Sequence, residues 1–350
     1  MFYEMVLRYE CMTYLRKLRR LLLMLGVVVL VTYGVLQNRK RISSRVMSDN
    51  INAHYQVKLQ PGLLQLINPT EPKYPYDVHY IKEDEAFCSS VTNLTFLVIV
   101  LSSTTNFNRR QTLRKTWANE SLYTSYGTLK VVFLLGTSDN AHVQKQIDKE
   151  FNLYGDMVQG AFLDTYENLT HKSTMGLKWA TERCRNARYV IKTDDDVVIN
   201  MFELFQNNKL SESENKTHVL CHRQSTRVLR DESEKWFVSH YQFKGMSRFP
   251  PYCGGLFVMI LNEVVPYLYE SASKTPFFWL EDVLLYGIAL NNIPGLKIQP
   301  IRENIEGFHI KASINCLDKM KKKCPLFVFM TVTLNDIVKL WATILQVYNS

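Results

Sequence analysis

The chain has 350 residues, of which 46% are hydrophobic and 12% aromatic, and its formal net charge is +9. This composition excludes a disordered or collagen-like chain and is that of a globular protein with one large domain or two ordinary ones. Residues 1–45 hold nine basic and two acidic residues, a net charge of +7, so the rest of the chain carries only +2. Because a nucleic-acid-binding protein keeps its basic excess in the folded body, we expect no nucleic-acid partner.

An uncharged apolar run, LLLMLGVVVLVTYGVL, occupies residues 21–36 with basic residues on both sides. Counted from Leu18, it just reaches the roughly 17 to 25 residues that span a bilayer, with two arginines snorkelling at its start. A cleaved signal peptide is the alternative, but the run is long for one and no small-residue cleavage site follows. We expect a cytosolic tail at residues 1–17, a retained transmembrane signal-anchor helix at 18–36, a stem at 37–90 and a lumenal folded domain at 91–350.

Two features after the anchor indicate the lumen of the secretory pathway. Four N-glycosylation sequons begin at Asn93, Asn119, Asn168 and Asn215. Six cysteines, an even number, suit disulfides in an oxidising compartment, although several could be reduced core residues. We expect a disulfide between Cys184, after a predicted helix, and Cys253, before a Gly-Gly turn. The short apolar span suits the thinner early secretory membranes, so we expect a type II membrane protein there.

The folded domain alternates apolar strands with helices. In chain order it has a buried strand at 96–101, a helix at 108–117, a strand at 130–136, a helix at 142–151, a helical face from Leu169 to Cys184, and a strand at 188–192. This alternation predicts an α/β fold with a largely parallel sheet. In such sheets the ligand site lies beyond the carboxyl ends of the strands.

Three adjacent carboxylates, Asp194, Asp195 and Asp196, follow the strand at 188–192 directly. Like charges at a strand end repel one another, and a divalent cation neutralises them at least cost. Their oxygen atoms suit a hard ion such as Mn²⁺ or Mg²⁺, which would in turn bind a diphosphate. A solvated acidic turn is the alternative, but apolar residues frame the run on both sides, so we favour a metal site.

Another carboxylate pair, Glu281 and Asp282, lies in the apolar stretch WLEDVLLYG. Burial there could desolvate one of them enough to accept a proton near neutral pH. The same residues could instead cap the start of a helix. The pattern leaves both interpretations open.

Two weaker signals lie elsewhere in the chain. Arg110 and Arg114 are spaced i, i+4 and project from one face of the predicted helix, where they could grip a nucleotide or simply face solvent. Gly254 and Gly255 lie between a Pro-Pro turn and the buried run at 256–261, which permits a ligand to approach the backbone closely.

Five segments together resemble the β-1,3-galactosyltransferase/N-acetylglucosaminyltransferase family over about residues 94–310; in order they are NFNRRQTLRKTW, FLDTYENLTHK, RYVIKTDDDVVIN, KWFVSHYQFKGMSRFPPYCGGLFVMI and FFWLEDVLLYG. The resemblance implies a GT-A-like fold with a mixed, largely parallel central sheet. It also implies an inverting, Golgi-anchored type II hexosyltransferase whose catalytic domain is lumenal.

The same resemblance implies roles for single residues. Asp196 would ligate Mn²⁺ or Mg²⁺, with His309 as a possible further ligand. Asp194 and Asp195 would hold the ribose and the donor side, and Asp282 would be the catalytic base. The remaining predicted contacts line the nucleotide pocket or lie beside donor and acceptor, and they are Arg110, Arg114, Gly254 and Gly255.

The implied reaction moves a hexose, with galactose favoured, from a UDP-sugar to the 3-hydroxyl of an acceptor glycan on a glycoprotein or glycolipid, in β linkage. A UDP-N-acetylhexosamine is the alternative donor, because Leu284 and the pair Leu256-Phe257 depart from the family's usual residues at sugar or acceptor contacts. Two other classes compete. A non-catalytic lumenal carbohydrate-binding protein would have little use for both buried carboxylate groups, and a metal-dependent phosphohydrolase would need more His and Asp ligands for a second metal.

Overall fold

The computed structural model describes residues 55–67, 78–206, 217–306 and 309–348. The predicted cytosolic tail and transmembrane anchor lie outside these residues, and within them no helix is both long and apolar enough to cross a bilayer. The chain divides into two compact units. The smaller includes Val228–His240, where the amide of Val238 donates to the carbonyl oxygen of Leu229 over 2.8 Å. Every element named below belongs to the larger unit, Val57–Arg227 with Tyr241–Ser350.

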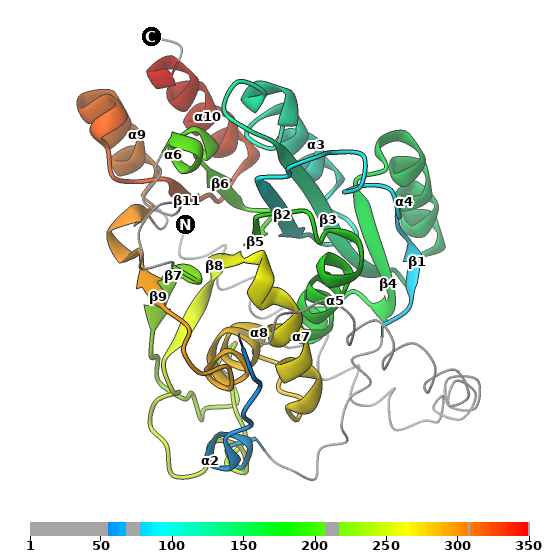
Figure 1. Ribbon diagram of the computed structural model, residues 1–350, viewed down its shortest axis with the longest axis vertical. Coiled ribbons are helices and arrows are strands. Elements are labelled where there is room, and N and C mark those ends of the chain that lie inside the picture. The colour runs from blue at the N-terminus through cyan, green and yellow to red at the C-terminus, as the bar shows by residue number, and fades with distance from the viewer. Residues whose placement is uncertain (1–54, 68–77, 207–216, 307–308, 349–350) are drawn as a thin grey trace. The chain divides into compact units, whose positions relative to one another are not determined.

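An eight-stranded sheet of order β1-β4-β3-β2-β5-β8-β7-β9 forms the core of the larger unit (Figure 1). Strands β4, β3, β2 and β5 are mutually parallel, and β9 is parallel to β7. The pairs β1–β4, β5–β8 and β7–β8 are antiparallel. The predicted α/β class with a mixed, largely parallel sheet is therefore confirmed. The strand bounds are β1 Tyr80–Lys82, β2 Phe96–Leu101, β3 Leu129–Thr137, β4 Met157–Leu163, β5 Tyr189–Asp194, β7 Val219–Gln224, β8 Tyr252–Leu261 and β9 Ile298–Pro300.

The α-helices of the larger unit alternate with these strands as the sequence predicted. Asn140 caps α4 by accepting hydrogen bonds from the amides of His142 and Val143, and the helix ends at Gly155 in the left-handed conformation that glycine favours. The helix bounds are α2 Pro61–Leu64, α3 Phe107–Lys115, α4 Ala141–Tyr154, α5 Leu169–Arg183, α6 Met201–Gln206, α7 Val265–Lys274, α8 Glu281–Val283, α9 Ile310–Met320 and α10 Leu334–Tyr348.

Helices cover both faces of the sheet, which explains why its central strand β2 is apolar throughout. All six residues of β2 are buried. Gly176 of α5 packs against the Leu134 side chain, whereas the Arg114 guanidinium of α3 lies over the neighbouring Phe133 ring, 4.8 Å from its centroid. Because adjacent residues of a strand point to opposite faces, α5 and α3 lie on opposite faces of the sheet.

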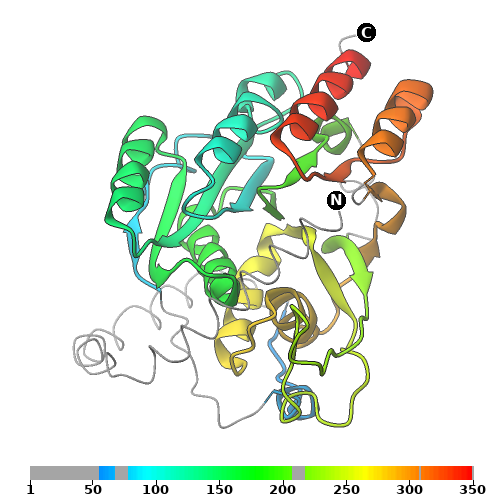
Figure 2. The ribbon, with the colours of Figure 1, turned by 180° about the vertical axis from the view of Figure 1, so that it is seen from behind.

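A second, three-stranded sheet of order β10-β11-β6 adjoins the carboxyl end of β5. Its strands are β6 Val197–Ile199, β10 Ile305–Glu306 and β11 Val328–Met330. Helix α10 packs against α9, α3 and β6, and Figure 2 shows α9 and α10 side by side near the C terminus. Just after β11, the amide and hydroxyl of Thr331 both donate to the carbonyl oxygen of Asp196, over 2.8 and 2.7 Å. The C-terminal segment therefore holds the backbone of the acidic turn.

Three disulfides join all six cysteines that follow residue 54, namely Cys88–Cys184, Cys221–Cys253 and Cys316–Cys324. The predicted Cys184–Cys253 pairing is wrong. Cys184 follows α5 and precedes the start of β5, at Tyr189. Cys253 lies at the start of β8, which runs antiparallel to β5 and so begins beside the other end of β5. The two cysteines are therefore at opposite ends of the sheet.

Part of the predicted stem belongs to the folded unit. Strand β1 pairs with β4, and Glu83 accepts hydrogen bonds from the Arg183 guanidinium and the Trp179 indole at 2.8 and 3.0 Å. With the Cys88–Cys184 disulfide, these contacts tie the segment that begins at Tyr80 to α5. The sequence did not predict strand β1 because its three residues have no apolar run.

Candidate active site

The acidic run lies at the carboxyl end of the central strand β5, where the sequence predicted chemistry. Strand β5 ends at Asp194 and β6 begins at Val197, so the other two carboxylates form the turn between the two sheets. Strand β2 lies on one side of β5 and β8 on the other. The turn is therefore at the edge of the sheet where α/β proteins bind their ligands.

Two of the three carboxylates are held by protein partners. Asp194 accepts a hydrogen bond from the Lys192 ammonium at 3.0 Å. Asp195 is buried and accepts hydrogen bonds from the Ser102 hydroxyl at 2.6 Å and the Asn106 amide at 2.9 Å. These bonds fix both side chains before any ligand binds.

The third carboxylate, Asp196, has no hydrogen-bonding or ion-pairing side chain in the part of the chain that the structure describes. Burial and repulsion by Asp194 and Asp195 raise the pKa of Asp196 to about 6, although Arg109 opposes this shift. A desolvated, unpaired carboxylate beside two others is the chemistry that a hard divalent cation neutralises. The donor set therefore fits Mn²⁺ or Mg²⁺.

A cation here would take few protein ligands. Among the described residues no three His, Cys, Asp or Glu side chains converge as a metal-binding group. Mg²⁺ commonly binds to one or two carboxylates, with substrate phosphates and water as its other ligands, and this turn could hold it in that way. His309 lies exposed just before α9, and its role as a ligand stays a prediction.

The carboxylate pair Glu281 and Asp282 begins helix α8, which continues as a π-helical segment, Leu284–Ala289. Glu281 is buried, accepts a hydrogen bond from the Ser173 hydroxyl at 2.6 Å and lies 3.5 Å from the Lys192 ammonium. Burial raises the pKa of Glu281 to about 7, despite the opposing charge of Lys192. Glu281 is therefore a buried structural carboxyl that is close to half protonated at neutral pH.

Asp282 has a different environment from its neighbour. It is half-buried, and one carboxylate oxygen accepts a hydrogen bond from the Val283 amide at 2.9 Å. Burial raises its pKa, while the Lys192 ammonium and the Val283 amide lower it. Asp282 is thus the member of the pair that combines some solvent access with an elevated basicity, as a general base requires.

Gly254 and Gly255 lie next to each other in β8 but have different neighbours. A Cβ atom at Gly255 would be 3.1 Å from the Lys192 ammonium, 3.4 Å from a Glu281 carboxylate oxygen and 3.7 Å from the Asp282 Cβ. A Cβ at Gly254 would be 2.9 Å from the Gln224 side-chain amide. The structure therefore brings Gly255 beside Asp282, whereas Gly254 faces β7.

The structure gives Arg110 and Arg114 partners within the protein rather than open faces. The Arg110 guanidinium is fully buried and donates to Glu150, at 2.6 Å for the shortest contact, and to the Ser102 hydroxyl at 3.1 Å. Arg114 donates to Glu150 at 2.6 Å and to Asp156 at 2.7 Å. Direct contact of Arg110 with a nucleotide, as the resemblance implied, does not agree with this burial. Its bond to Ser102, which in turn holds Asp195, indicates a supporting role.

Several residues at the site were not predicted as functional, and they are Ser102, Asn106, Ser173 and Lys192. Lys192 had a signal that could have been used, because it is a charged residue that follows the apolar run Tyr189–Ile191 and lies two residues before the three carboxylates. A buried lysine needs a carboxylate partner. The others are hydroxyl and amide residues whose role depends on contacts between distant segments, which spacing does not reveal.

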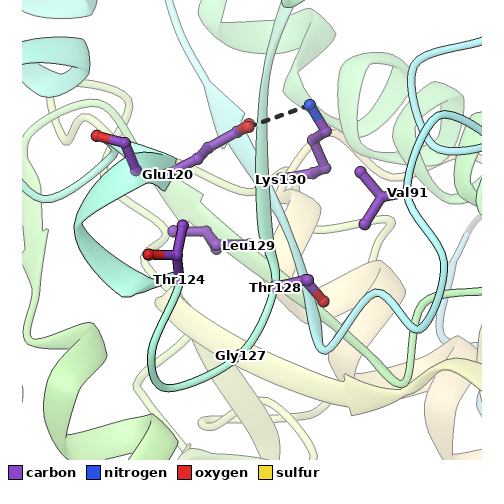
Figure 3. Close-up of a pocket in the computed structure, with 8 residues that line it drawn as sticks. Val91, Glu120, Thr124, Gly127, Thr128, Leu129 and Lys130 are labelled. Atoms are coloured by element: carbon purple, nitrogen blue, oxygen red, sulfur yellow. Dashed lines mark ion pairs between the residues drawn. The ribbon is translucent and has the colours of Figure 1, made fainter.

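A hollow lies at the start of β3, the end remote from the acidic turn, and is shown in Figure 3. Lys130 and Glu120 form an ion pair across it at 3.1 Å. Strands β2 and β3 start here and run away toward the acidic turn. The hollow is therefore remote from the carboxylates, at the edge of the sheet where α/β proteins do not place their main ligand site.

An acidic turn at the end of a central parallel strand, faced by a half-buried carboxylate, is the arrangement of an enzyme that transfers a group from a phosphate-bearing donor. Residues 108–302 match the model of the Galactosyltransferase family. The chain therefore belongs to the galactosyltransferase family and is a hexosyltransferase, and the mixed sheet agrees with the GT-A-like fold that the motifs implied.

Named relatives agree with this assignment. The chain is 35% identical over 227 residues to UDP-GalNAc:beta-1,3-N-acetylgalactosaminyltransferase 1 of Sus scrofa, covering 63% of this chain and 66% of that protein. It is 32% identical over 223 residues to beta-1,3-galactosyltransferase 5 of Gorilla gorilla gorilla, covering 63% and 72%. It is 29% identical over 226 residues to human beta-1,3-galactosyltransferase 1, covering 64% and 68%.

Solved structures show only distant likeness. The galactosyltransferase LgtC in complex with donor and acceptor sugar analogues matches 71% of this chain and 96% of its own, at a TM-score of 0.35 and 11% identity. The bifunctional glycosyltransferase WbbM matches 74% and 52%, at a TM-score of 0.38 and 9% identity.

Proposed function

We propose that the protein transfers a hexose, galactose in the first instance, from a UDP-sugar to the 3-hydroxyl of an acceptor glycan with inversion to a β linkage. The observation that carries this is the pairing of two unlike carboxylate groups at one edge of the sheet. The acidic turn holds an unpaired Asp196, and the start of α8 presents Asp282. The membership of the family supports the reaction type.

Each carboxylate has a separate task in this reaction. Asp196 would hold the divalent cation, which when bound supplies Lewis-acid stabilisation of the leaving diphosphate. Asp194 and Asp195, fixed by Lys192 and Ser102, would orient the donor. Asp282 would take the proton from the acceptor hydroxyl as that oxygen attacks the anomeric carbon from the face opposite the diphosphate.

The acceptor would approach past the glycine pair of β8. A Cβ atom at Gly255 would crowd the Lys192 ammonium, at 3.1 Å, and would contact Glu281 and Asp282. The absence of side chains there leaves space for a sugar ring beside Asp282. No covalent enzyme intermediate is needed, because a single displacement inverts the anomeric carbon.

The experiment is a donor panel on the purified full chain. UDP release would be measured with UDP-galactose, UDP-N-acetylglucosamine and UDP-N-acetylgalactosamine, with and without β-linked acceptor oligosaccharides. We expect acceptor-dependent release that Asp282→Asn lowers by about 10²–10⁴-fold while UDP affinity stays unchanged. Equal release without acceptor would favour a phosphohydrolase, and binding of glycan without any release would favour a carbohydrate-binding protein.

The identity of the donor sugar is the most specific part of the proposal. A UDP-N-acetylhexosamine is the second candidate, because the pig relative is named for N-acetylgalactosamine transfer and because Leu284 and Phe257, both buried beside the site, depart from the usual family residues. The panel decides between the sugars by their relative kcat/KM.

We also propose a Golgi membrane location as a single-pass type II protein, with the hexosyltransferase domain in the lumen. The apolar run at 21–36, the four sequons and the three disulfides support this. Resistance of the folded domain to protease in sealed microsomes, together with sensitivity of its N-linked glycans to a peptide N-glycosidase, tests it.

A further inference from the structure

One buried ammonium group lies between the two parts of the site. Lys192 is the fourth residue of β5 and is almost entirely buried. Its Nζ atom lies 3.0 Å from a carboxylate oxygen of Asp194, 2.7 Å from the carbonyl oxygen of Gly255 and 3.5 Å from a carboxylate oxygen of Glu281. These three partners belong to β5, β8 and α8.

The mechanism above uses this lysine only to hold Asp194 and gives it no role at Asp282, yet its burial has a cost. Taking an ammonium out of water costs several kcal/mol unless anionic partners compensate. Burial alone would lower the pKa of Lys192, but Asp194 and Glu281 outweigh that effect and raise it. Lys192 therefore stays charged at neutral pH, and its positive charge is placed among carboxylates on both sides of the site.

We propose that Lys192 is a positioning residue that fixes the acidic turn and the start of helix α8 in one arrangement and keeps Asp282 ionised for proton abstraction. This inference rests on the proposed function for the role of Asp282 but not for the placement of the charge. The ammonium fixes Asp194 by a hydrogen bond, fixes the β8 backbone at Gly255, and faces the carboxylate pair of α8.

The charge balance around Asp282 shows why one lysine matters. The groups that face it are Lys192 and Asp194 from β5, Glu281 from its own helix, Tyr252 from β8 and Tyr286 from the π-helical segment. Tyr252 is neutral, because burial and the Asp282 charge raise its pKa to about 12. Lys192 is thus the one cation in this set, and the other charged members repel an ionised Asp282.

The test replaces Lys192 by methionine, which keeps the length of the side chain and removes the charge. The matched control is Lys172→Met. Lys172 is equally buried and also bonds a carboxylate, Asp164, at 2.7 Å, and a backbone carbonyl, that of Ser102, at 2.6 Å. It lies in α5 and is not among the groups that shift the pKa of Asp282.

Two measurements report the protonation of the Asp282 carboxyl. The first is the acidic limb of the pH profile of kcat. The second is the ¹³C carboxyl resonance of Asp282 in aspartate-labelled full-length protein, identified by its loss in Asp282→Asn. We expect Lys192→Met to move both midpoints up by about one pH unit, with Lys172→Met leaving both midpoints in place.

The outcomes separate this inference from the proposed function. Wild-type midpoints in a folded Lys192→Met protein would overturn the inference and leave the function standing. A shifted carboxyl resonance in a protein that transfers no sugar would support the placement of the charge and overturn the function. If Lys192→Met does not fold, the double variant Lys192→Met/Glu281→Gln removes the cation and its buried partner together. An upward shift of the Asp282 resonance smaller than that of Lys192→Met is then expected, because the repulsion by Glu281 is lost as well, and an unchanged midpoint would overturn the inference.

Discussion

Replacing Glu281 by glutamine should make the stability of the protein less sensitive to a rise in pH from about 5 to 8. Glu281 is buried at the start of α8, with the Ser173 hydroxyl and the Lys192 ammonium as its partners. Burial raises its pKa from 4.5 to about 7, so the folded state binds a proton more tightly than the unfolded state. This carboxyl therefore contributes to stability fully below pH 4.5, and the contribution is lost as the pH rises to about 7.

The size of the effect follows from the pKa difference. Each pKa unit corresponds to about 1.4 kcal/mol, so a rise from 4.5 to about 7 limits the total to about 3 kcal/mol. Most of this loss, about 2 to 3 kcal/mol, falls between pH 5 and pH 8. Glutamine keeps the shape and the hydrogen bond from Ser173 but does not ionise. The free energy of unfolding of Glu281→Gln, relative to that of the wild type, should therefore rise by about 2 to 3 kcal/mol between pH 5 and pH 8.

The assay is urea denaturation of both proteins at intervals from pH 5 to pH 8.5, with the disulfides intact. The quantity of interest is the difference in free energy of unfolding between wild type and Glu281→Gln, because other titrating groups cancel in it. Two parallel curves would show that Glu281 has an ordinary pKa, and the assignment of Glu281 as the structural member of the pair would then fail. Asp282→Asn is the control, since its half-buried carboxyl should give a smaller slope.

Three further predictions concern metal binding, the ion-pair network and the disulfides. Asp196→Ala should abolish the Mn²⁺-dependent part of UDP binding in titration calorimetry, and undiminished Mn²⁺-dependent affinity would exclude Asp196 as the ligand. Glu150→Ala should cost about 3–5 kcal/mol of unfolding free energy, because it leaves the buried Arg110 without a carboxylate. Asp148→Ala, on the same helix with an exposed Lys82 pair at 2.9 Å, should cost under about 1 kcal/mol, and equal costs would contradict this reasoning. Non-reducing peptide mapping should recover Cys88 linked to Cys184, and recovery of Cys184 linked to Cys253 would contradict the structure. Because the Cys88–Cys184 bond spans 96 residues, its loss should cost about 4 to 5 kcal/mol of unfolding free energy in the chain-entropy model.

The sequence predicted the sheet and the acidic turn well because each depends on local pattern. The apolar strand FLVIVL is buried along its whole length, and the strand that ends at Asp194 has the same signature of continuous burial. The position of the acidic turn at the end of this strand then follows from chain order alone. The short strand β1 has no such signature, because it is held by its partner β4 and by contacts to α5.

The partners of the site residues could not be predicted in the same way. Arg110 and Arg114 do project together from one helix, as their spacing predicts, but spacing does not say what lies opposite. The structure places Glu150 of α4 there, which satisfies both guanidinium groups. Likewise, the wrong cysteine pairing assumed that Cys253 and Cys184 share an edge, and only the antiparallel direction of β8 shows that they do not.

The two hydrogen bonds from Thr331 to the carbonyl oxygen of Asp196 have a consequence for how the enzyme can be shortened. Residues 108–302 match the family model, and a C-terminal expression boundary at residue 302 would keep every carboxylate of the site. It would nevertheless delete β11 and α10. Thr331 would be lost with them, and no other described residue donates both an amide and a hydroxyl hydrogen bond to the Asp196 carbonyl oxygen. Such a truncated enzyme would retain the Asp196 side chain but lose these two hydrogen bonds to its backbone. The segment around Thr331 therefore supports the acidic turn although it lies outside the residues that match the family model.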